Sequence, residues 1–350
     1  MPGLVVLGWD IGGANIKAAR IHGAGEHGFE VVEQPFALWR APRNLPAMLR
    51  NVADRLGDAP AMALTMTAEL ADCFASKREG VSFVLDAFQT AFPDVASWVF
   101  GTDGRFRSID AARDRPDAVA AANWMAAAMM VARRFPDGLF LDVGTTTTDI
   151  IPIAGGRVAA CGRTDTERLR TGELVYTGAL RTPVAAVVRS VRFRGQACRV
   201  AAEHFAITAD VHLWLRHIDE HGYTCETPDG RGPGRREAAA RLARVVCADL
   251  EMLSDDDLTA IARSVERKQI RQIAAAIRQV LRQLRSARAH AAVVAGSGSF
   301  LARAAAQQAG LAVHDLADAL GPAVSSAAPA AAVARLLIEQ AELLHRSAAL

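Results

Sequence analysis

Two stretches of the chain share one pattern of apolar and polar positions. LVVLGWDIGGANIKAARIHG, residues 4–23, and GLFLDVGTTTTDIIPIAGGRV, residues 138–158, each contain an apolar strand, an aspartate, a turn rich in Gly, Thr or Asn, and a second apolar strand. A strand, a tight turn and another strand form a β-hairpin. Because this unit occurs twice at a wide separation, the pattern predicts a duplicated domain.

The positions after the first hairpin predict a mixed sheet with helices packed on it. Strands are expected at 29–38, 61–66 and 97–100, and helices with apolar residues at helical spacing at 45–56 and 81–92. The alanine-rich run 118–132 predicts one buried helix. It is too short to cross the roughly 30 Å of a bilayer core.

The second copy is followed by a longer elaboration. Residues 164–236 show little periodicity, and helices are expected at 235–253 and 256–288. They are followed by a strand in AAVVAGSGSF (291–300), a helix from about Leu301 and another after Pro329. In the long helix one apolar stripe comprises Ile270, Ile273, Ile277, Val280, Leu281 and Leu284. Arg271, Arg278, Arg282 and Arg285 lie mostly off this stripe. They indicate a solvated helix face, with an acidic partner as the alternative.

Length and composition add a domain plan and a compartment. The 350 residues are enough for two domains, which we place at 1–117 and 118–350, with the helical elaboration at about 185–290 and a C-terminal helix that could pack back. A net charge of +2 gives no reason to expect nucleic acid or a membrane as partner. Five scattered cysteines and a start without a signal-peptide pattern indicate a reducing, cytoplasmic compartment. Oligomeric state is not predicted.

The turns of both hairpins have the chemistry of a phosphate site. Glycine lets the backbone approach an anion, and successive N–H groups bind it. Aspartates would repel phosphate unless a cation such as Mg²⁺ lies between them. The residues of this kind are Asp10, Gly12, Gly13, Asn15 and Lys17 in the first turn, and Asp142, Gly144, Thr145, Thr146, Thr147, Thr148 and Asp149 in the second. Lys17 is expected to pair with the phosphate.

A third turn completes the set. Gly296, Ser297 and Gly298 follow an apolar strand and open a helix, which suits the ribose or base of a nucleotide or another anion. Taken singly, the first and third turns could be ordinary tight turns. The Asp–Gly–Thr₄–Asp run is harder to explain by structure alone, and the three together favour ligand binding.

These motifs resemble those of a known group. The three turns resemble the phosphate and adenosine motifs of the acetate kinase/Hsp70/actin superfamily, whose fold is α/β with two duplicated ribonuclease-H-like domains and a central cleft. More narrowly, the chain is similar to the hydantoinase/oxoprolinase A family, in its short branch of tetrahydromethanopterin-linked one-carbon pathway proteins. The blocks that carry this are GWDIGGANIKAA (8–19), TMTAELADCFASKREGV (65–81), FLDVGTTTTDIIPI (140–153) and TGELVYTGALRTPV (171–184).

The resemblance implies a reaction in methanofuran-type cofactor biosynthesis. A Mg²⁺-dependent transferase would displace diphosphate from an aminomethylfuran diphosphate with the amine of a glutamylated tyramine or tyrosine. The alternatives are an ATP-dependent oxoprolinase- or hydantoinase-type amide or lactam hydrolase, and a non-enzymatic ATP-driven reactivating module. Under the leading hypothesis Asp10, Asp142 and Asp149 organise Mg²⁺, and ATP is a ligand only under the alternatives.

The two remaining blocks supply candidates for the reacting groups. Lys77 and Arg78 could neutralise a diphosphate, and Glu69 or Asp72 could accept a proton; a solvated loop is the alternative. Residues that could line the organic part of the substrate are Thr171, Glu173, Tyr176 and Arg181. Cys73 has no base spaced to activate it. The histidines at 204, 212, 217 and 221 match no metal motif, and we interpret them as surface residues.

Overall fold

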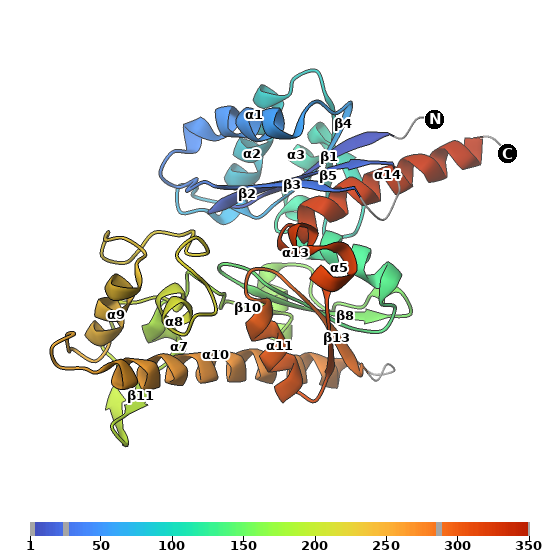
Figure 1. Cartoon of the computed structure of the whole chain (residues 1–350). Helices are drawn as coiled ribbons and strands as arrows, with labels where there is room; N and C mark the ends of the chain where they lie inside the picture. Colours follow the sequence, from blue (N-terminus) through green and yellow to red (C-terminus); the bar gives the residue numbers. More distant parts are fainter. Residues whose placement is uncertain (1–3, 24–27, 285–288, 349–350) are drawn as a thin grey trace. The chain divides into compact units, whose positions relative to one another are not determined.

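The computed structural model describes residues 4–23, 28–284 and 289–348, and it contains two large sheets and a small two-stranded one (Figure 1). The chain divides into two compact units. Unit 1 comprises residues 1–140, 151–168 and 314–350, and unit 2 comprises residues 141–150 and 169–313. One large sheet lies within residues 5–108 and the other within 138–315. The boundary between the compact units passes through the second sheet, and the division between 117 and 118 stays a prediction.

The first sheet has the strand order β3-β2-β1-β4-β5-β6. Its strands are β1 (Val5–Ile11), β2 (Asn15–His22), β3 (Glu30–Pro35), β4 (Ala61–Met66), β5 (Ala96–Phe100) and β6 (Phe106–Ser108). The pairs β1–β2 and β2–β3 are antiparallel, whereas β1–β4 and β4–β5 are parallel. The predicted hairpin is therefore present, and its first strand lies at the centre of the sheet.

The second sheet repeats this order as β10-β8-β7-β13-β14, with β9 beside β8. Its strands are β7 (Gly138–Val143), β8 (Thr148–Ala154), β9 (Arg157–Val158), β10 (Leu174–Val175), β13 (Ala291–Ala295) and β14 (Ala312–Asp315). In both sheets the third and second strands lie on one side of the first, and the fourth and fifth on the other. The prediction of two duplicated ribonuclease-H-like sheets, the plan of the acetate kinase/Hsp70/actin fold, is confirmed by this shared order.

Alternation along β1 gives the first sheet two buried faces. Leu7, Trp9 and Ile11 are fully buried in one cluster with residues of α1 (Leu45–Leu56) and α2 (Lys77–Ala91). Gly8 points to the other face, where α14 (Ala328–Ala348) lies, and an added Cβ there would be 2.1 Å from the carbonyl oxygen of Ala330. The helix near the C-terminus thus packs directly on β1.

The remaining helices of unit 1 are short. They are η1 (Pro42–Asn44), η2 (Ala68–Leu70), α3 (Ile109–Asp114), α4 (Pro116–Val119), α5 (Asn123–Arg134), α12 (Leu316–Leu320) and α13 (Pro322–Ser326); α6 (Asp165–Thr171) begins in unit 1. The single helix expected at 118–132 is wrong. Ala120 forms a parallel bridge to Met66 and Ala121 has a φ of 50°, so the run is interrupted before α5 begins.

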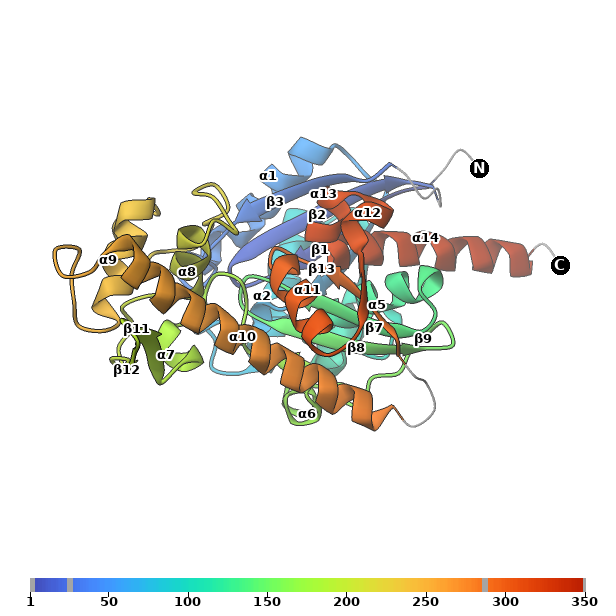
Figure 2. The same ribbon diagram turned by 60° about the horizontal axis from the view of Figure 1, so that its bottom comes forward.

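In unit 2, α10 (Asp255–Gln283) runs along the other helices (Figure 2). They are α7 (Val184–Val187), α8 (Thr208–Trp214), α9 (Arg235–Arg244) and α11 (Ser299–Gln308), with the small hairpin β11 (Ser190–Phe193) and β12 (Gln196–Arg199). Ser254 and Asp257 form a capping box that fixes the start of α10. The helix expected at 235–253 ends at Arg244, and Arg285 lies outside the described residues.

Candidate functional site

The first hairpin turn is tight and half-buried. The amide of Gly12 donates to the carbonyl oxygen of Asn15 at 2.9 Å, and a Cβ on Gly12 would lie 2.9 Å from that same oxygen. The backbone of Gly13 accepts from the amide of Leu38. Around Gly13 there is more space, because an added Cβ would meet its nearest atom at 3.9 Å. The turn therefore has a fixed backbone and an open side.

Lys17 and Asp10 are directly opposite each other in the β1–β2 pair, so their side chains share one face of the sheet. Lys17 Nζ donates to the carbonyl oxygen of Ser326 and lies 3.6 Å from the Glu33 carboxylate. The lysine that the sequence assigns to phosphate binding is thus held by groups of unit 1.

Glu69 is a buried carboxylate of unit 1. It lies in η2 just after β4, and only 1% of the residue is exposed. Among the described residues its Oε2 has no hydrogen-bond partner. The backbone of Glu69 is pressed against α2, where a Cβ on Gly80 would come within 2.2 Å of the Glu69 carbonyl oxygen. Only glycine at position 80 permits this approach, which holds Glu69 in the interior.

Burial raises the pKa of Glu69 to about 7, from an ordinary value of 4.5. Removal from water disfavours the charged carboxylate and is the largest cause. The negative charges of Asp165 and Asp10 act in the same direction, whereas Lys77 lowers the pKa. A carboxylate of this pKa exchanges protons near neutral pH, as a general base requires.

The charged segment after Glu69 is exposed at most positions. Asp72 and Arg78 are exposed, and Lys77 at the start of α2 forms a 2.7 Å ion pair with Asp165. The structure therefore separates the two candidate bases: Glu69 is buried, and Asp72 faces water. Asp165 could not be found from the sequence, because its connection to Lys77 spans 88 positions.

The second hairpin turn is supported far more extensively. The Gly144 amide closes the turn on the carbonyl oxygen of Thr147 at 2.9 Å. Backbone amides of Ala179, Leu180 and Arg181 donate to the carbonyl oxygens of Gly144 and Thr145. At Gly178 an added Cβ would lie 2.5 Å from the amide nitrogen of Thr146. The segment 177–181, which follows β10, thus acts as a brace beneath the threonine turn.

Two buried side chains anchor this brace. Gln269 of α10 donates from Nε2 to Thr177 Oγ1 at 2.9 Å and to the Gly178 carbonyl oxygen at 2.8 Å, and Thr208 Oγ1 donates to the same carbonyl. The Thr148 hydroxyl is fully buried and donates to the Thr177 carbonyl oxygen at 2.7 Å. Thr148 is therefore structural, whereas Thr145, Thr146 and Thr147 are only half-buried. Gln269 was missed from the sequence, where it lies within an ordinary helical pattern.

The third turn lies against the end of β7 in the same unit. The Gly298 amide donates to the Val143 carbonyl oxygen at 2.8 Å, and Ser297 lies between the two glycines. Gly296 has a φ of 86°, and a Cβ there would be 2.3 Å from Asp142 Oδ1. The second and third motifs of the sequence therefore meet at the carboxylate of Asp142.

The four residues predicted to line the organic part of the substrate have different environments. Glu173 is fully buried and accepts a 2.9 Å hydrogen bond from Thr171 Oγ1. Tyr176 is 62% exposed, and Arg181 is half-buried. Glu173 therefore serves the interior of unit 2, and Tyr176 is the accessible member of the set.

The carboxylates assigned to Mg²⁺ offer a suitable donor set. In unit 2, Asp142 ends β7 and is half-buried, and Asp149 lies in β8 with 8% exposed. Carboxylate oxygens are hard donors of the kind that suits Mg²⁺. A Cβ on Gly296 would approach Asp142 Oδ1 to 2.3 Å, so only glycine fits beside this carboxylate. These residues fit the cation that the sequence predicts.

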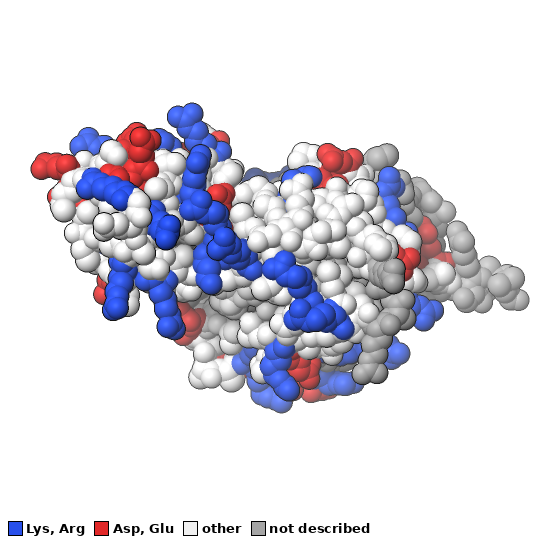
Figure 3. All heavy atoms as spheres, turned by 90° about the horizontal axis from the view of Figure 1, so that it is seen from below, with Lys and Arg blue, Asp and Glu red and all other residues white. Residues whose placement is uncertain are grey.

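Exposed cations follow the long helix of unit 2. Figure 3 shows a row of Lys and Arg on the face where α10 runs. The exposed ones on α10 are Arg263, Arg267, Lys268, Arg271, Arg278 and Arg282. Arg278 donates to the Gln308 carbonyl oxygen, and the others fit the predicted solvated face. None of the described helices is long and apolar enough to cross a membrane.

Comparisons with known proteins place these features in context. The model of the Hydantoinase/oxoprolinase family matches residues 61–340. A Methanocaldococcus jannaschii protein named (4-{4-[2-(gamma-L-glutamylamino)ethyl]phenoxymethyl}furan-2-yl)methanamine synthase is 37% identical over 338 residues, 96% of this chain and 98% of that one. A Methanococcus vannielii protein of the same name is 44% identical over 124 residues, 35% of this chain and 55% of its own length. Among solved structures, the ethanolamine utilization protein EutJ from Carboxydothermus hydrogenoformans has a TM-score of 0.49 and 12% identity, over 95% of this chain and 90% of that one.

Proposed function

The chain belongs to the hydantoinase/oxoprolinase family, and we propose that within it the protein is a synthase of methanofuran-type cofactor biosynthesis. The observation that carries this proposal is the identity of 37% to the Methanocaldococcus jannaschii synthase, which extends over 96% of this chain and 98% of the relative. The residues proposed to bind diphosphate and to accept a proton are those of the hairpin turns and of the segment that begins at Glu69. The reaction is a transfer of a furan-bearing methylene group.

The relative's product name identifies the bond that such an enzyme makes. It contains a phenoxymethyl group, in which an aryl oxygen is bonded to the methylene carbon on the furan. Its ethylamine nitrogen carries the glutamyl group. The resemblance of the sequence implied the amine nitrogen as the nucleophile, and this name supports the phenol oxygen instead. We therefore propose that a glutamylated tyramine attacks through its phenol.

The atoms balance with diphosphate as the leaving group. The phenol oxygen forms a bond to the furfuryl carbon, and the bond between that carbon and the diphosphate oxygen breaks. The phenol proton passes to a base, and the electron pair of the broken bond leaves with diphosphate. Since a phenol has a pKa of about 10, a base that accepts its proton as the oxygen attacks lowers the barrier at neutral pH.

Glu69 is the base that the proposal selects. It is buried, its Oε2 has no hydrogen-bond partner among the described residues, and its pKa is about 7. The exposed Asp72 lacks these properties. In the same scheme the amide of Gly13 and the hydroxyls of the threonine turn bind diphosphate oxygens. The Gly12 and Gly144 amides close their own turns and keep these groups oriented.

Asp10, Asp142 and Asp149 are the residues that would hold Mg²⁺. When bound, Mg²⁺ supplies positive charge that stabilises the departing diphosphate. Lys77 is paired with Asp165 and Lys17 with Ser326 and Glu33. We therefore propose that these lysines contribute only to the electrostatic potential around diphosphate, and that the hairpin turns contact it directly.

The experiment incubates the purified full chain and Mg²⁺ with aminomethylfuran diphosphate and one of two acceptors. The first acceptor is N-glutamyl-tyramine, and the second is its O-methyl ether carrying a free amine in place of the glutamyl group. We expect diphosphate release and an ether product, by mass spectrometry, with the first acceptor only. Product from the free amine would restore nitrogen as the nucleophile.

Titration calorimetry separates this function from the ATP-dependent alternatives. With Mg²⁺ present, inorganic diphosphate should bind, and ATP should be hydrolysed slowly or not at all. Tight ATP binding with phosphate release stimulated by an amide or lactam would overturn the synthase proposal in favour of an oxoprolinase-type enzyme. Release stimulated only by a protein partner would favour a reactivating module.

A further inference from the structure

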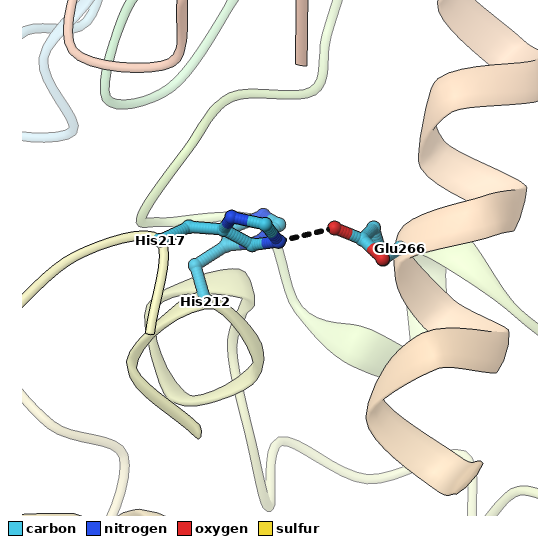
Figure 4. Close-up of side chains that lie close together, drawn as sticks. All are labelled: His212, His217 and Glu266. Carbon is cyan, nitrogen blue, oxygen red and sulfur yellow. Dashed lines mark hydrogen bonds and ion pairs between the residues drawn. The ribbon is translucent and has the colours of Figure 1, made fainter. Parts of the chain in front are cut away.

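A second cluster of ligand-type side chains lies in unit 2, away from the residues discussed so far. His212 belongs to α8, His217 follows it, and Glu266 belongs to α10 (Figure 4). Each residue offers one ligand atom, and these atoms all lie within 4.8 Å of one another. The expectation that these histidines lie at the surface is wrong for His212, which is fully buried.

The end of α8 brings the two imidazoles together. Arg216 has a φ of 64°, in the left-handed region that non-glycine residues rarely adopt. This turn lets the amide of His217 donate to the carbonyl oxygen of His212 at 2.8 Å. Phe300 of α11 stacks on the His217 ring and meets the His212 ring edge-on. The amide of Arg216 also donates to the Leu213 carbonyl oxygen, so α8 closes in a Schellman-type end, and this end and Phe300 together fix the two rings.

The hydrogen bonds around His212 fix which of its nitrogens carries the proton. Gln269 uses its amide nitrogen to donate to the Gly178 carbonyl, which can only accept, so its Oε1 faces His212 Nε2 at 3.1 Å. The Nε2 atom must therefore donate, which leaves Nδ1 with a free lone pair. Nδ1 is buried and has no hydrogen-bond partner among the described residues. A buried lone pair of this kind is costly unless something binds it.

His212 also stays neutral, as a metal ligand must. Burial lowers its pKa to about 3 and is the largest cause; the hydrogen bond to Gln269 acts in the opposite direction, and the nearby His217 lowers it further. His217 Nε2 lies 2.5 Å from Glu266 Oε1, with 35% and 18% of their side chains exposed.

We propose that His212, His217 and Glu266 bind a divalent transition-metal ion. Two imidazoles and one carboxylate form a ligand set typical of Zn²⁺, and nitrogen ligands favour Zn²⁺ or Co²⁺ over Mg²⁺. His217 lines an open hollow of about 620 Å³, which gives an ion access from solvent. The proposal is independent of the synthase function, because none of the three residues belongs to the turns or to the Glu69 segment.

The site would connect to the threonine turn through one residue. Gln269 holds His212 on one side, and on the other it holds Thr177 and Gly178, which brace the threonine turn. A bound ion would fix His212 and thereby Gln269. The ion is expected to rigidify this part of unit 2 and to raise its melting temperature.

The test uses the full chain stripped of metal with a chelator. Co²⁺ is titrated and followed by its visible absorption, and Zn²⁺ is titrated by calorimetry with excess Mg²⁺ present. We expect one ion per chain. Because loss of an outer-sphere partner already costs 10–100-fold in metal affinity, His217→Gln and Glu266→Gln should each weaken binding by about 100-fold or more.

The matched control is His221→Gln, which removes an exposed histidine four positions further along and should leave binding unchanged. Both ligand variants replace partly exposed side chains, so the metal-free melting curve should match that of the wild type. The proposal is overturned if the wild type binds Zn²⁺ no more tightly than His217→Gln, or if His221→Gln weakens binding as much. A shift in melting without a change in affinity would also contradict it.

Discussion

The two hairpin turns share one sequence pattern, but different hydrogen bonds hold them in place. The Gly12–Asn15 turn of unit 1 is closed by its own backbone and has open space beside Gly13. The Gly144–Thr147 turn of unit 2 rests on a brace that Gln269 and Thr208 hold by buried hydrogen bonds. Unit 1 in turn contains Glu69, which lies just after β4 and whose pKa burial raises to about 7.

The difference indicates a division of labour between copies of one fold. A turn held from below by many hydrogen bonds is preorganised, which is what binding a multiply charged anion requires. A buried carboxylate beside a looser turn is suited to exchanging a proton. We therefore propose that the hairpin turn of unit 2 binds the anion and that Glu69 of unit 1 accepts the proton.

The largest expected effect is the loss of a metal carboxylate from either copy. Asp142→Asn and Asp10→Asn should each lower kcat/KM by about a thousandfold, since charge stabilisation by a metal ion is worth several kcal/mol. The exposed Asp94 provides the control, and Asp94→Asn should be unaffected. If both variants turn over substrate at the wild-type rate, these residues do not hold Mg²⁺.

Removal of the base should reduce activity by about 10²–10⁴-fold. Glu69→Gln keeps the shape of the neutral carboxyl group, so the fold should be retained. In the wild type, activity should rise with pH through about 7, as Glu69 loses its proton. The measurement is a pH–rate profile, and Asp72→Asn is the matched control. If Asp72→Asn abolished that rise and Glu69→Gln did not, the two assignments would be exchanged.

The same substitution should change stability in the opposite direction. The folded pKa of about 7 exceeds the ordinary 4.5, so the wild type is stabilised by the neutral form below about pH 4.5 and loses that stability as the pH rises through 7. At pH 8, Glu69→Gln should be more stable by about 3 kcal/mol. Urea unfolding at pH 5 and pH 8 should show this gap widening with pH, and an equal gap at both values would contradict it.

A smaller effect should separate the two turns through their glycines. Gly178→Ala places a Cβ against the Thr146 backbone and should cost about 1–3 kcal/mol. Gly13→Ala meets nothing closer than 3.9 Å and should change the free energy of unfolding by less than about 0.5 kcal/mol. Denaturant melts measure both. Equal costs would mean that the second turn is no better supported than the first.

The smallest effect is expected from the thiols. All five cysteines are free, and burial raises the pKa of the Cys73 thiol and that of Cys225, the latter to about 12. Neither forms a reactive thiolate at neutral pH. Replacing all five by Ser or Ala should therefore leave kcat close to that of the wild type. A loss of activity on Cys73→Ser alone, with an unchanged melt, would indicate covalent catalysis.

The spacing of apolar residues predicted those helices and strands that depend only on neighbouring residues in the sequence. The helix at 45–56 and the strand at 61–66 have the bounds that apolar spacing indicates, and both hairpins are present. Glu69 was a candidate because it follows a strand end, but its burial depends on Gly80 of α2, which the sequence alone does not bring near. Gln269 and Asp165 gain their roles from partners about 90 positions away. The spacing of residues along the sequence does not reveal contacts between positions so far apart.

The packing of α14 on β1 has a consequence for the order in which the protein can be made. β1 is among the first strands to be synthesised, but Gly8 has no side chain because its face is covered by the backbone of Ala330. At a synthesis rate of 5–20 residues per second, on the order of tens of seconds pass before that cover exists. During this interval the central strand of the first sheet exposes one bare face. Nascent unit 1 should therefore be a substrate for chaperones until α14 has left the ribosome.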